Sequence, residues 1–138
     1  MALISVTRLR LRSVRFLPQF VWWGFRSGVQ AKRARGNVTA TGLRDSHLTF
    51  WTLTAWTDEN SMRAFMLSGA HKRAMPKLVE WCDEASVVHW HQESADLPSW
   101  TEAHQRMVEE GRLSRVRYPS DSQVAKRITP PRVSSTRS

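Results

Sequence analysis

The segment HLTFWTLTAW, residues 47–56, constrains the fold more than any other part of the sequence. Its alternation has the period of a β-strand, in which successive side chains point to opposite faces. One face carries Trp51 and Leu53. The other carries Phe50 and Trp56, and threonines occupy most of the positions between these residues. A strand that is apolar on both faces is covered on both sides, so the sequence predicts helices over one face of a sheet and a second cover over the other.

The periodicity on either side of this segment predicts the remaining strands and helices. Strands are expected at 2–11, 37–43 and 86–91, and helices at 13–35 and 62–81, the second interrupted at Ser68-Gly69 and Pro76. The element order is then β-α-β-β-α-β, which is the ferredoxin-like arrangement of the α+β class, an antiparallel sheet with helices on one face. A short helix at 100–111 and an edge strand at 113–118 complete the expected domain.

The second cover of the sheet is expected to come from outside the chain. Only two long helical segments, 13–35 and 62–81, are available, and the ferredoxin-like arrangement places both on the same face. The simplest cover for the bare face is the same face of a second copy, because identical chains most often associate as symmetric pairs. We therefore expect a homodimer.

The chain is expected to form one domain followed by a tail. A chain of 138 residues is too short for two cores of useful size. Residues 1–118 carry the apolar periodicity, whereas residues 119–138 contain few large apolar side chains and many Ser, Pro and Arg. Such a composition does not offset the entropy cost of ordering, so we predict that 119–138 is a disordered basic tail.

The net charge of +9 is concentrated at the two ends of the chain. Residues 1–35 hold eight Lys and Arg and no acid, and residues 112–138 hold seven against one acid. The central residues 36–111 hold six against eleven acids. Any contact with nucleic acid would therefore come from the ends. Because aromatic residues are not interleaved with the arginines of the tail, as base stacking requires, nucleic acid is not expected as a partner.

No segment of the sequence has the pattern of a targeting signal or a membrane span. An apolar run at 16–25 follows the basic start, but Pro18 and Gln19 interrupt it, and it is far shorter than the roughly 20 residues that span a bilayer. The single cysteine, Cys82, excludes an internal disulfide. We therefore expect a cytoplasmic protein without a membrane partner.

Four short motifs in the central part of the chain resemble one known group of proteins. They are FWTLTAW at 50–56, ENSMRAF at 59–65, SGAH at 68–71 and EW at 80–81. Together they resemble the antibiotic-biosynthesis-monooxygenase-like group of dimeric α/β barrels, and most closely its spheroidene-monooxygenase-like and uncharacterised branches. The resemblance covers residues 47–91, and the order of elements extends it to 1–91.

The resemblance implies a fold and a general function. Two chains would pair sheet to sheet, and each would hold an apolar pocket between its sheet and its helices. The group includes haem-binding proteins and cofactor-free monooxygenases, which oxidise activated phenolic or polyketide-like substrates through the substrate's own carbanion. We therefore expect a monooxygenase-like oxidoreductase for a small aromatic, polyketide or isoprenoid substrate, with either no cofactor or haem. The alternative is a non-catalytic module of the same fold that binds a small ligand or a partner.

The resemblance also singles out residues for the pocket. His71 matches the histidine that often follows the helix break in this group. Trp51, Trp56, Phe65 and Met66 match pocket or core positions. His71 is the expected catalytic residue, and the others are expected to bind the substrate or to pack around it.

Three roles are open to His71. It would serve as a general base, because an unperturbed histidine exchanges a proton near pH 6.5, about neutrality. It would equally serve as an axial ligand of haem, as imidazole commonly does. The third role is structural, in which the side chain caps the second part of the interrupted helix or bonds to a neighbouring chain.

Two further features of the helical segments have a functional and a structural interpretation. Trp22 and Trp23 would line a ligand pocket, although aromatic residues at helical spacing more often belong to the core. Cys82 would be a thiolate ligand of haem, but a single cysteine on an apolar helical face is more often a buried small hydrophobic residue. The structural interpretation is favoured for both.

The strands carry two polar pairs. His89 and His91 share one strand face at a spacing that chelates metals, but no third ligand lies at a recognisable spacing, so we predict no metal site. Arg8 and Arg10 share a face of the first strand. They would form a clamp for an anion or carboxylate, or protect a solvated strand edge, and the solvated edge is favoured.

Overall fold

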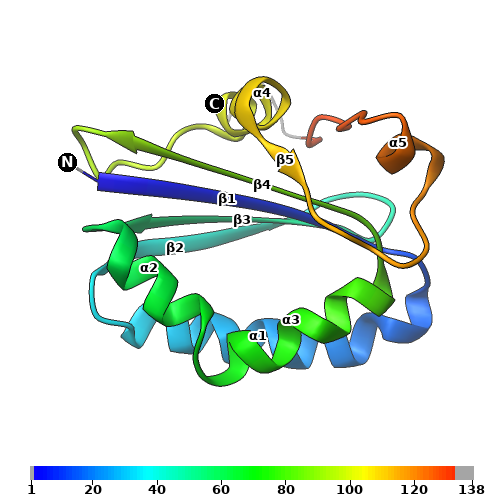
Figure 1. The fold of residues 1–138 in the computed structure, drawn as a ribbon, viewed down its shortest axis with the longest axis horizontal. Coiled ribbons are helices and arrows are strands. Elements are labelled where there is room, and N and C mark those ends of the chain that lie inside the picture. Colours follow the sequence, from blue (N-terminus) through cyan, green and yellow to red (C-terminus); the bar gives the residue numbers. More distant parts are fainter. Residues whose placement is uncertain (1, 133–138) are drawn as a thin grey trace.

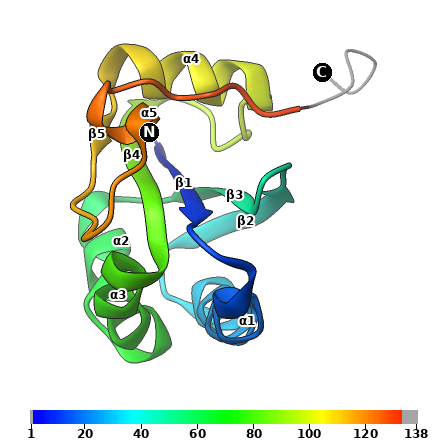
Figure 2. The same ribbon diagram turned by 90° about the vertical axis from the view of Figure 1, so that its right-hand side faces the viewer.

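The computed structural model of the chain describes residues 2–132 and contains a five-stranded sheet with helices on both faces (Figure 1). The strands are β1 (Ala2–Leu11), β2 (Asn37–Arg44), β3 (Thr49–Trp56), β4 (Cys82–Gln92) and β5 (Arg112–Leu113), and the helices are α1 (Leu17–Arg33), α2 (Glu59–Met66), α3 (Gly69–Trp81), α4 (Trp100–Glu110) and α5 (Asp121–Val124). Helices α1, α2 and α3 lie on one face of the sheet, and α4 and α5 lie on the other (Figure 2). The structure therefore has three layers.

The core of this arrangement is the predicted ferredoxin-like α+β fold. The strand order is β2-β3-β1-β4-β5, and every neighbouring pair is antiparallel. β3 begins at Thr49 rather than at the predicted residue 47, because His47 and Leu48 adopt positive φ angles of 58° and 60° in the turn after β2. β5 is limited to Arg112–Leu113, whereas the sequence predicts an edge strand at 113–118.

The helices on the pocket side begin and end at the residues that their caps favour. Pro18 lies in the first turn of α1, where its missing N–H has no partner to lose. Asp58 caps α2 by accepting a hydrogen bond from the backbone N–H of Ser61 over 2.7 Å. Gly69, with a φ angle of 59°, follows the break between α2 and α3, as predicted, whereas Pro76 lies within α3 and does not end it. None of the helices in residues 2–132 combines the length and apolar character that crossing a membrane requires.

Both faces of β3 are covered, as predicted, but the cover of the far face, the side of α4, comes from the chain itself. The buried side chains on that face form one cluster, made up of Ile4, Val6, Trp51, Leu53, Ala55, Val88 and Trp90. Ala103 and Met107 of α4 are buried in the same cluster, and Ile128 packs against it. α4 therefore closes the face that the sequence analysis left bare.

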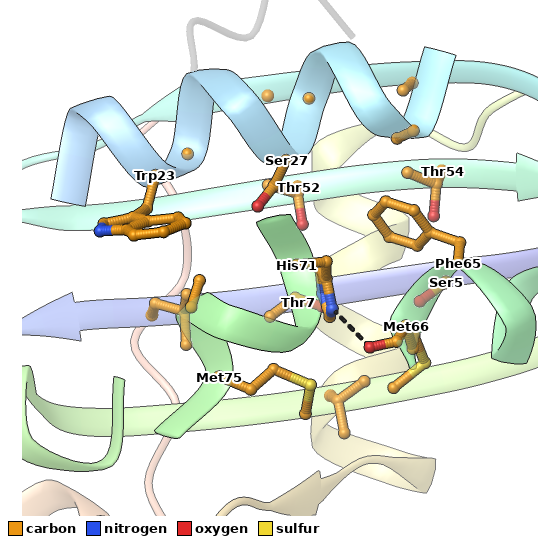
Figure 3. Close-up of a pocket in the computed structure, with 18 of the residues that line it drawn as sticks. Ser5, Thr7, Trp23, Ser27, Thr52, Thr54, Phe65, Met66, His71 and Met75 are labelled. Carbon is orange, nitrogen blue, oxygen red and sulfur yellow. Dashed lines mark hydrogen bonds between the residues drawn. The ribbon is translucent and has the colours of Figure 1, made fainter. Parts of the chain in front are cut away.

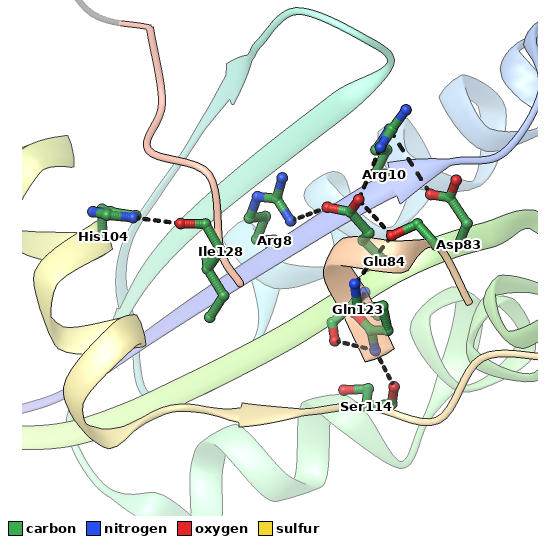
Figure 4. Close-up of polar contacts among 10 residues, drawn as sticks. Arg8, Arg10, Asp83, Glu84, His104, Ser114, Gln123 and Ile128 are labelled. Atoms are coloured by element: carbon green, nitrogen blue, oxygen red, sulfur yellow. Dashed lines mark hydrogen bonds and ion pairs between the residues drawn. The ribbon is translucent and has the colours of Figure 1, made fainter. Parts of the chain in front are cut away.

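The C-terminal segment, residues 119–132, also packs on this side, where the sequence predicts a disordered tail. The side chain of Gln123 donates a hydrogen bond to the carbonyl of Ser114 over 2.9 Å, and Nε2 of His104 donates to the carbonyl of Ile128 over 2.7 Å (Figure 4). These anchors are polar, so a composition argument based on apolar burial misses them. The rest of the predicted tail, 133–138, lies outside the described residues.

The covered far face changes the basis of the homodimer prediction. That prediction rests on a bare sheet face, and α4 with the C-terminal segment covers this face in residues 2–132. Sheet-to-sheet pairing of two chains would require these elements to move. The homodimer itself stays a prediction.

Arg8 and Arg10 lie in the middle of the sheet, not on the solvated edge that the sequence analysis favours. β1 is paired on both sides, and Arg8 is only 4% exposed. Nη1 of Arg8 lies 2.7 Å from Oε1 of Glu84, and Nη1 of Arg10 lies 2.8 Å from Oε2 of the same carboxylate (Figure 4). The pair is thus a carboxylate clamp, and the carboxylate belongs to β4 of the same chain.

Candidate functional site

A cavity of about 410 Å³ lies between the sheet and helices α1, α2 and α3. This volume is within the range of about 300–1,000 Å³ that is usual for small-molecule sites. Figure 3 shows side chains from the sheet and from all three helices around the same space. The residues that line it are mostly apolar or carry hydroxyl groups. The sequence analysis predicts a pocket in this place.

The floor of the cavity has a polar centre. Ser5 and Thr7 of β1 point to the helix side, and their antiparallel partners on β3 are Thr54 and Thr52 (Figure 3). On the other side of β1, Ser5 is paired with His89 of β4. Directly paired side chains on one face have Cβ atoms about 4.5–5.5 Å apart. The register therefore places Thr54, Ser5 and His89 side by side across three strands.

The wall formed by α1 consists of small residues. Gly24, Ser27, Gly28 and Ala31 recur at i, i+3, i+4 and i+7, so they share one helical face, and all four line the cavity. A Cβ atom added at Gly24 or Gly28 would meet no atom within 4 Å. A glycine inside a helix costs about 1 kcal/mol relative to alanine. Two such glycines leave open the space above the floor.

Aromatic residues close one end of the cavity. The ring centroids of Trp56 and Phe65 are 5.2 Å apart. Nε1 of Trp56 donates a hydrogen bond to Oγ1 of Thr54 over 2.9 Å, which fixes the indole against the floor. Trp23 of α1 and Met75 of α3 line another part of the wall (Figure 3).

His71 lies in the first turn of α3, directly after the break, and its ring is held from two sides. Nδ1 lies 3.2 Å from the carbonyl oxygen of Met66, and the ring centroid lies 4.6 Å from that of Phe65 (Figure 3). The backbone N–H of His71 donates to Oε1 of Gln30 over 2.9 Å. Because a carbonyl oxygen only accepts hydrogen bonds, the contact between Nδ1 of His71 and Met66 requires the proton on Nδ1. Nε2 is then left as the acceptor.

The protonation state of His71 suits a base. Burial lowers the pKa of the imidazole, and the hydrogen bond to Met66 opposes this only in part, so the pKa lies below the ordinary value of 6.5. The ring is therefore neutral at neutral pH, with an unprotonated Nε2. The bond to Met66 also ties the end of α2 to the start of α3, which gives this histidine a structural role at the helix break.

Haem fits the lining less well than an uncharged ligand does. The bond from Nδ1 of His71 to a carbonyl is the arrangement that metal-ligating histidines commonly have. However, Lys32 is the only lysine or arginine among the lining residues. Haem carries two anionic propionates, and a buried charge is costly unless it is paired. Lys32 would offer a cationic partner to only one of them.

The structure brings most of the predicted site residues together. Trp23, Trp56, Phe65, Met66 and His71 all line the cavity. Phe65, Met66 and His71 come from the two sides of the helix break, whereas Trp23 comes from α1 and Trp56 from β3.

Two predicted residues lie elsewhere. Trp51 is fully buried on the far face, where its ring contacts those of Trp100 and His104 with centroids 6.5 and 6.3 Å away. Trp22 is 57% exposed on the outside of α1, and the guanidinium of Arg26 lies 5.8 Å from its ring centroid. Neither residue lines the cavity.

The sequence analysis misses the polar floor. Ser5, Thr7, Thr52 and Thr54 carry a signal in retrospect, because small hydroxyl residues occupy alternate positions of β1 and of β3. His89 is weighed there only as a metal ligand with His91. His91 is exposed and does not line the cavity, and residues 2–132 contain no group of three or more His, Cys, Asp and Glu that could hold a metal ion.

Cys82 is a buried small residue, which is the interpretation that the sequence analysis favours over a ligand of haem. Its side chain is fully buried. Burial, together with the nearby carboxylate of Asp83, raises the pKa of the thiol to about 12. A thiolate ligand at this position is therefore strongly disfavoured near neutral pH.

A comparison with protein families finds one match. A family model described as "Domain of unknown function (DUF3291)" matches residues 17–114. The match includes the cavity-lining helices and most of the sheet, and it ends before the C-terminal segment. No curated protein matches the chain.

Solved structures with the same fold include proteins described as oxygenases. SnoaB from Streptomyces nogalater, a cofactor-independent oxygenase, is 18% identical with a TM-score of 0.55, and the alignment covers 71% of this chain and 98% of that one. A putative antibiotic biosynthesis monooxygenase from Nitrosomonas europaea is 13% identical with a TM-score of 0.60, covering 67% of this chain and 90% of that one. A conserved protein from Methanosarcina mazei Go1 is 17% identical with a TM-score of 0.60, covering 67% and 94%. The fold is therefore that of the antibiotic-biosynthesis-monooxygenase-like proteins, and about a third of this chain has no counterpart in these structures.

Proposed function

Because the chain belongs to the family described as Domain of unknown function (DUF3291), and has the fold of antibiotic-biosynthesis-monooxygenase-like proteins, we propose that it is a monooxygenase-like oxidoreductase. Its substrate is a small, largely apolar molecule that binds in the cavity between the sheet and helices α1, α2 and α3. His71 is the general base, and Trp23, Trp56, Phe65 and Met66 form the apolar contact surface.

The environment of His71 is the observation that carries the proposal. Its pKa is lowered by burial, so the ring is neutral, and its Nδ1 is occupied by the carbonyl of Met66. The free Nε2 belongs to a side chain that lines an apolar cavity. A neutral imidazole with a free nitrogen in such a site is placed to remove a proton from a bound carbon acid or phenol.

The proposed reaction needs only the substrate and molecular oxygen. Nε2 of His71 takes a proton from a CH2 group that neighbouring aromatic or carbonyl groups acidify. The carbanion transfers electrons to O2, a C–O bond forms, and the imidazolium returns its proton to the outer oxygen to give a hydroperoxide. Loss of the second hydrogen from the same carbon and cleavage of the O–O bond give a ketone and water. CH2 and O2 thus become C=O and H2O, and the substrate carbon is oxidised while O2 is reduced.

The lining restricts the charge of the substrate. It contains no Asp or Glu, so a bound ammonium group would have no carboxylate partner. Its charged or titratable side chains are Lys32, His71 and His89. A neutral or weakly acidic molecule fits such a site, and a cationic one does not.

The test is oxygen uptake with anthrone, an apolar tricyclic ketone with an acidic CH2 group. The purified protein should consume one O2 per anthrone and release anthraquinone. General acid-base catalysis typically contributes about 10²–10⁴-fold, so His71→Ala should lower kcat by that factor. His91→Ala, which changes an exposed histidine outside the cavity, should leave the rate unchanged.

Two results would contradict the proposal. If a panel of acidic phenols and aryl ketones elicits no oxygen uptake above the uncatalysed rate, the oxygenase function fails. If the protein as purified shows a Soret band that shifts in His71→Ala, the histidine is an axial ligand of haem and not a base for cofactor-free chemistry.

The second candidate is a non-catalytic binding module with the same cavity. The hydrogen bond between His71 and Met66 favours it, because this contact also has a structural role at the break between α2 and α3. Tight binding of an aryl ketone, unchanged in His71→Ala and without oxygen uptake, would assign this function in place of the first.

A further inference from the structure

The floor of the cavity holds a buried nitrogen without a partner. Nε2 of His89 is inaccessible to solvent and forms no hydrogen bond within residues 2–132. Buried polar side-chain atoms nearly always have a partner, and an exception calls for a bound molecule or another specific reason. His89 is also one of the residues that line the cavity. His89 therefore lines the proposed binding site with an imidazole whose hydrogen bonding the described part of the chain leaves incomplete.

The neighbours of His89 supply more hydrogen-bonding groups but do not satisfy it. Ser5 is its direct partner on β1, and Thr54 is the partner of Ser5 on β3. Oγ1 of Thr54 already accepts the indole N–H of Trp56, which leaves its own proton free to donate. Within residues 2–132 the hydroxyl of Ser5 forms no hydrogen bond to another side chain.

We infer that His89 and Ser5 form a polar subsite that binds an uncharged oxygen substituent, a hydroxyl or carbonyl group, of an otherwise apolar substrate. This inference rests on the proposed function and narrows its substrate class to hydroxy- or oxo-substituted aromatic or similarly apolar molecules. Unsubstituted hydrocarbons would fill the same space but would leave the subsite unpaired.

The chemistry of the subsite selects oxygen. A neutral imidazole offers one donor and one acceptor, and a serine hydroxyl offers both, so together they satisfy a group that donates and accepts. Burial is the main reason why the pKa of His89 is lowered, and the positive charge of the nearby Arg112 lowers it further. The imidazole is therefore kept neutral. An ammonium group on the ligand would find no carboxylate in the lining to pair with. A hydroxyl or carbonyl oxygen is uncharged and requires no such partner.

The position of the subsite also orients the substrate. His89 comes from the floor, on β4, and His71 comes from the helix layer, on α3. An oxygen substituent held at the floor turns the remaining part of the molecule toward the helices, where Nε2 of His71 is available. His89 is thus a positioning residue, and His71 is the residue that acts on the reacting carbon.

The test compares two probes of nearly the same shape, 2-naphthol and 2-methylnaphthalene, by equilibrium dialysis at pH 7.5. A net hydrogen bond in a buried site should favour the naphthol by about fivefold. In His89→Phe, which keeps a ring of similar size but removes both nitrogens, the ratio of the two affinities should fall toward one. The matched control His91→Phe changes an exposed histidine two positions along the same strand, and its ratio should equal that of the unchanged protein.

A second measurement uses the unchanged protein, so it does not depend on the folding of a variant. The ring nitrogen signals of His89 should shift when 2-naphthol is added and should not shift with 2-methylnaphthalene. Ser5→Ala should lower the affinity ratio in the same direction as His89→Phe. The inference is overturned if the ratio in folded His89→Phe is unchanged, if the nitrogen signals of His89 respond equally to both probes, or if neither probe binds.

Failure of this inference and failure of the proposed oxygenation are separable. The affinity ratio requires no turnover, so a ratio that depends on His89 without any oxygen uptake removes only the oxygenase function. If oxygen uptake depends on His71 but the ratio of the two affinities is the same with and without His89, only the inference of a polar subsite fails.

Discussion

The hydroxyl of Ser120 donates a hydrogen bond to Oε2 of Glu84 over 2.7 Å, and this bond joins the C-terminal segment to the central part of the sheet. The same carboxylate accepts hydrogen bonds from Arg8 and Arg10 of β1. Ser120 also caps α5, because its oxygen accepts the backbone N–H of Gln123 over 3.1 Å. One carboxylate thus links three parts of the chain, and its removal should loosen all of them.

Substitutions at Ser120 and Glu84 should destabilise the protein to different degrees. Ser120→Ala loses a cap and a hydrogen bond, so we expect a loss of about 1–2 kcal/mol in the free energy of unfolding. Glu84→Gln leaves the buried Arg8 without its carboxylate and should cost about 3–5 kcal/mol. Urea unfolding measures both, with Ser122→Ala as the control on the same helix. If Ser120→Ala and Glu84→Gln lose the same free energy of unfolding, the ion pair of Glu84 contributes no more than a single capping hydrogen bond.

The stability of the protein should depend on pH through Glu84. Burial alone would raise the pKa of this carboxyl, but hydrogen bonds from Ser120, Arg8 and Arg10 outweigh it and lower the pKa below its ordinary value of 4.5. A lowered pKa in the folded state gives stability that is complete above the unfolded-state pKa and is lost as the pH falls through the folded-state value. Unfolding midpoints should therefore drop below about pH 4.5. Glu84→Gln should show a smaller drop over the same window, and an identical pH profile would contradict this assignment.

The oxygenase activity should have an acid limb that reports on His71. Burial is the main reason why the pKa of its imidazole lies below 6.5, so the neutral base is present at pH 6.5 and above. The midpoint of the acid limb of kcat/KM should therefore lie below pH 6.5, and kcat/KM should fall tenfold per pH unit once the pH is below the lowered pKa. An acid limb centred above pH 6.5 would mean that another group acts as the base.

Filling the glycine positions of α1 should separate stability from binding. Gly28→Leu places a side chain in open space within the cavity, and leucine favours a helix over glycine by roughly 0.5–1 kcal/mol. We therefore expect a higher thermal midpoint together with at least about a tenfold loss of naphthol affinity, since the ligand and the side chain compete for the same space. A variant that binds the probe as well as the unchanged protein would place the ligand elsewhere.

Two tryptophans should respond in opposite ways to substitution. Trp51→Ala removes a fully buried ring from the far face and should cost about 3–5 kcal/mol of stability. Trp22→Ala changes an exposed ring and should stay within about 0.5 kcal/mol. In neither variant should the folded protein lose affinity for 2-naphthol, because neither residue lines the cavity. Dialysis at a temperature where both variants are folded checks this point.

The sequence predicts the elements of the fold well, because the signals for them are local. The period of β3 and the break at Gly69 each depend on neighbouring residues, and the structure has both of them. The C-terminal segment is different, because Ser120 and Glu84 are 36 positions apart. A polar anchor that joins distant positions leaves no trace in composition, so the segment is predicted as a disordered tail.

The site is predicted in part for the same reason. His71 follows a break that is visible in the sequence, and Phe65 and Met66 lie just before it. The alternation in β3 separates Trp51 from Trp56 correctly, but it does not say which face meets the helices. That choice depends on the strand order of the whole sheet. The hydroxyl groups of the floor become a group only when the register of β1 with β3 and β4 is known.

The cover of the far face by α4 and the C-terminal segment has a consequence for how the protein responds to dilution. In an obligate dimer the cover of a sheet is a second molecule, and its stability falls as the protomer concentration falls. Here the cover is joined to the sheet by the chain, so its effective concentration is set by the length of the connection and not by the amount of protein. The layer over the far face should therefore be as complete in a dilute solution as in a concentrated one.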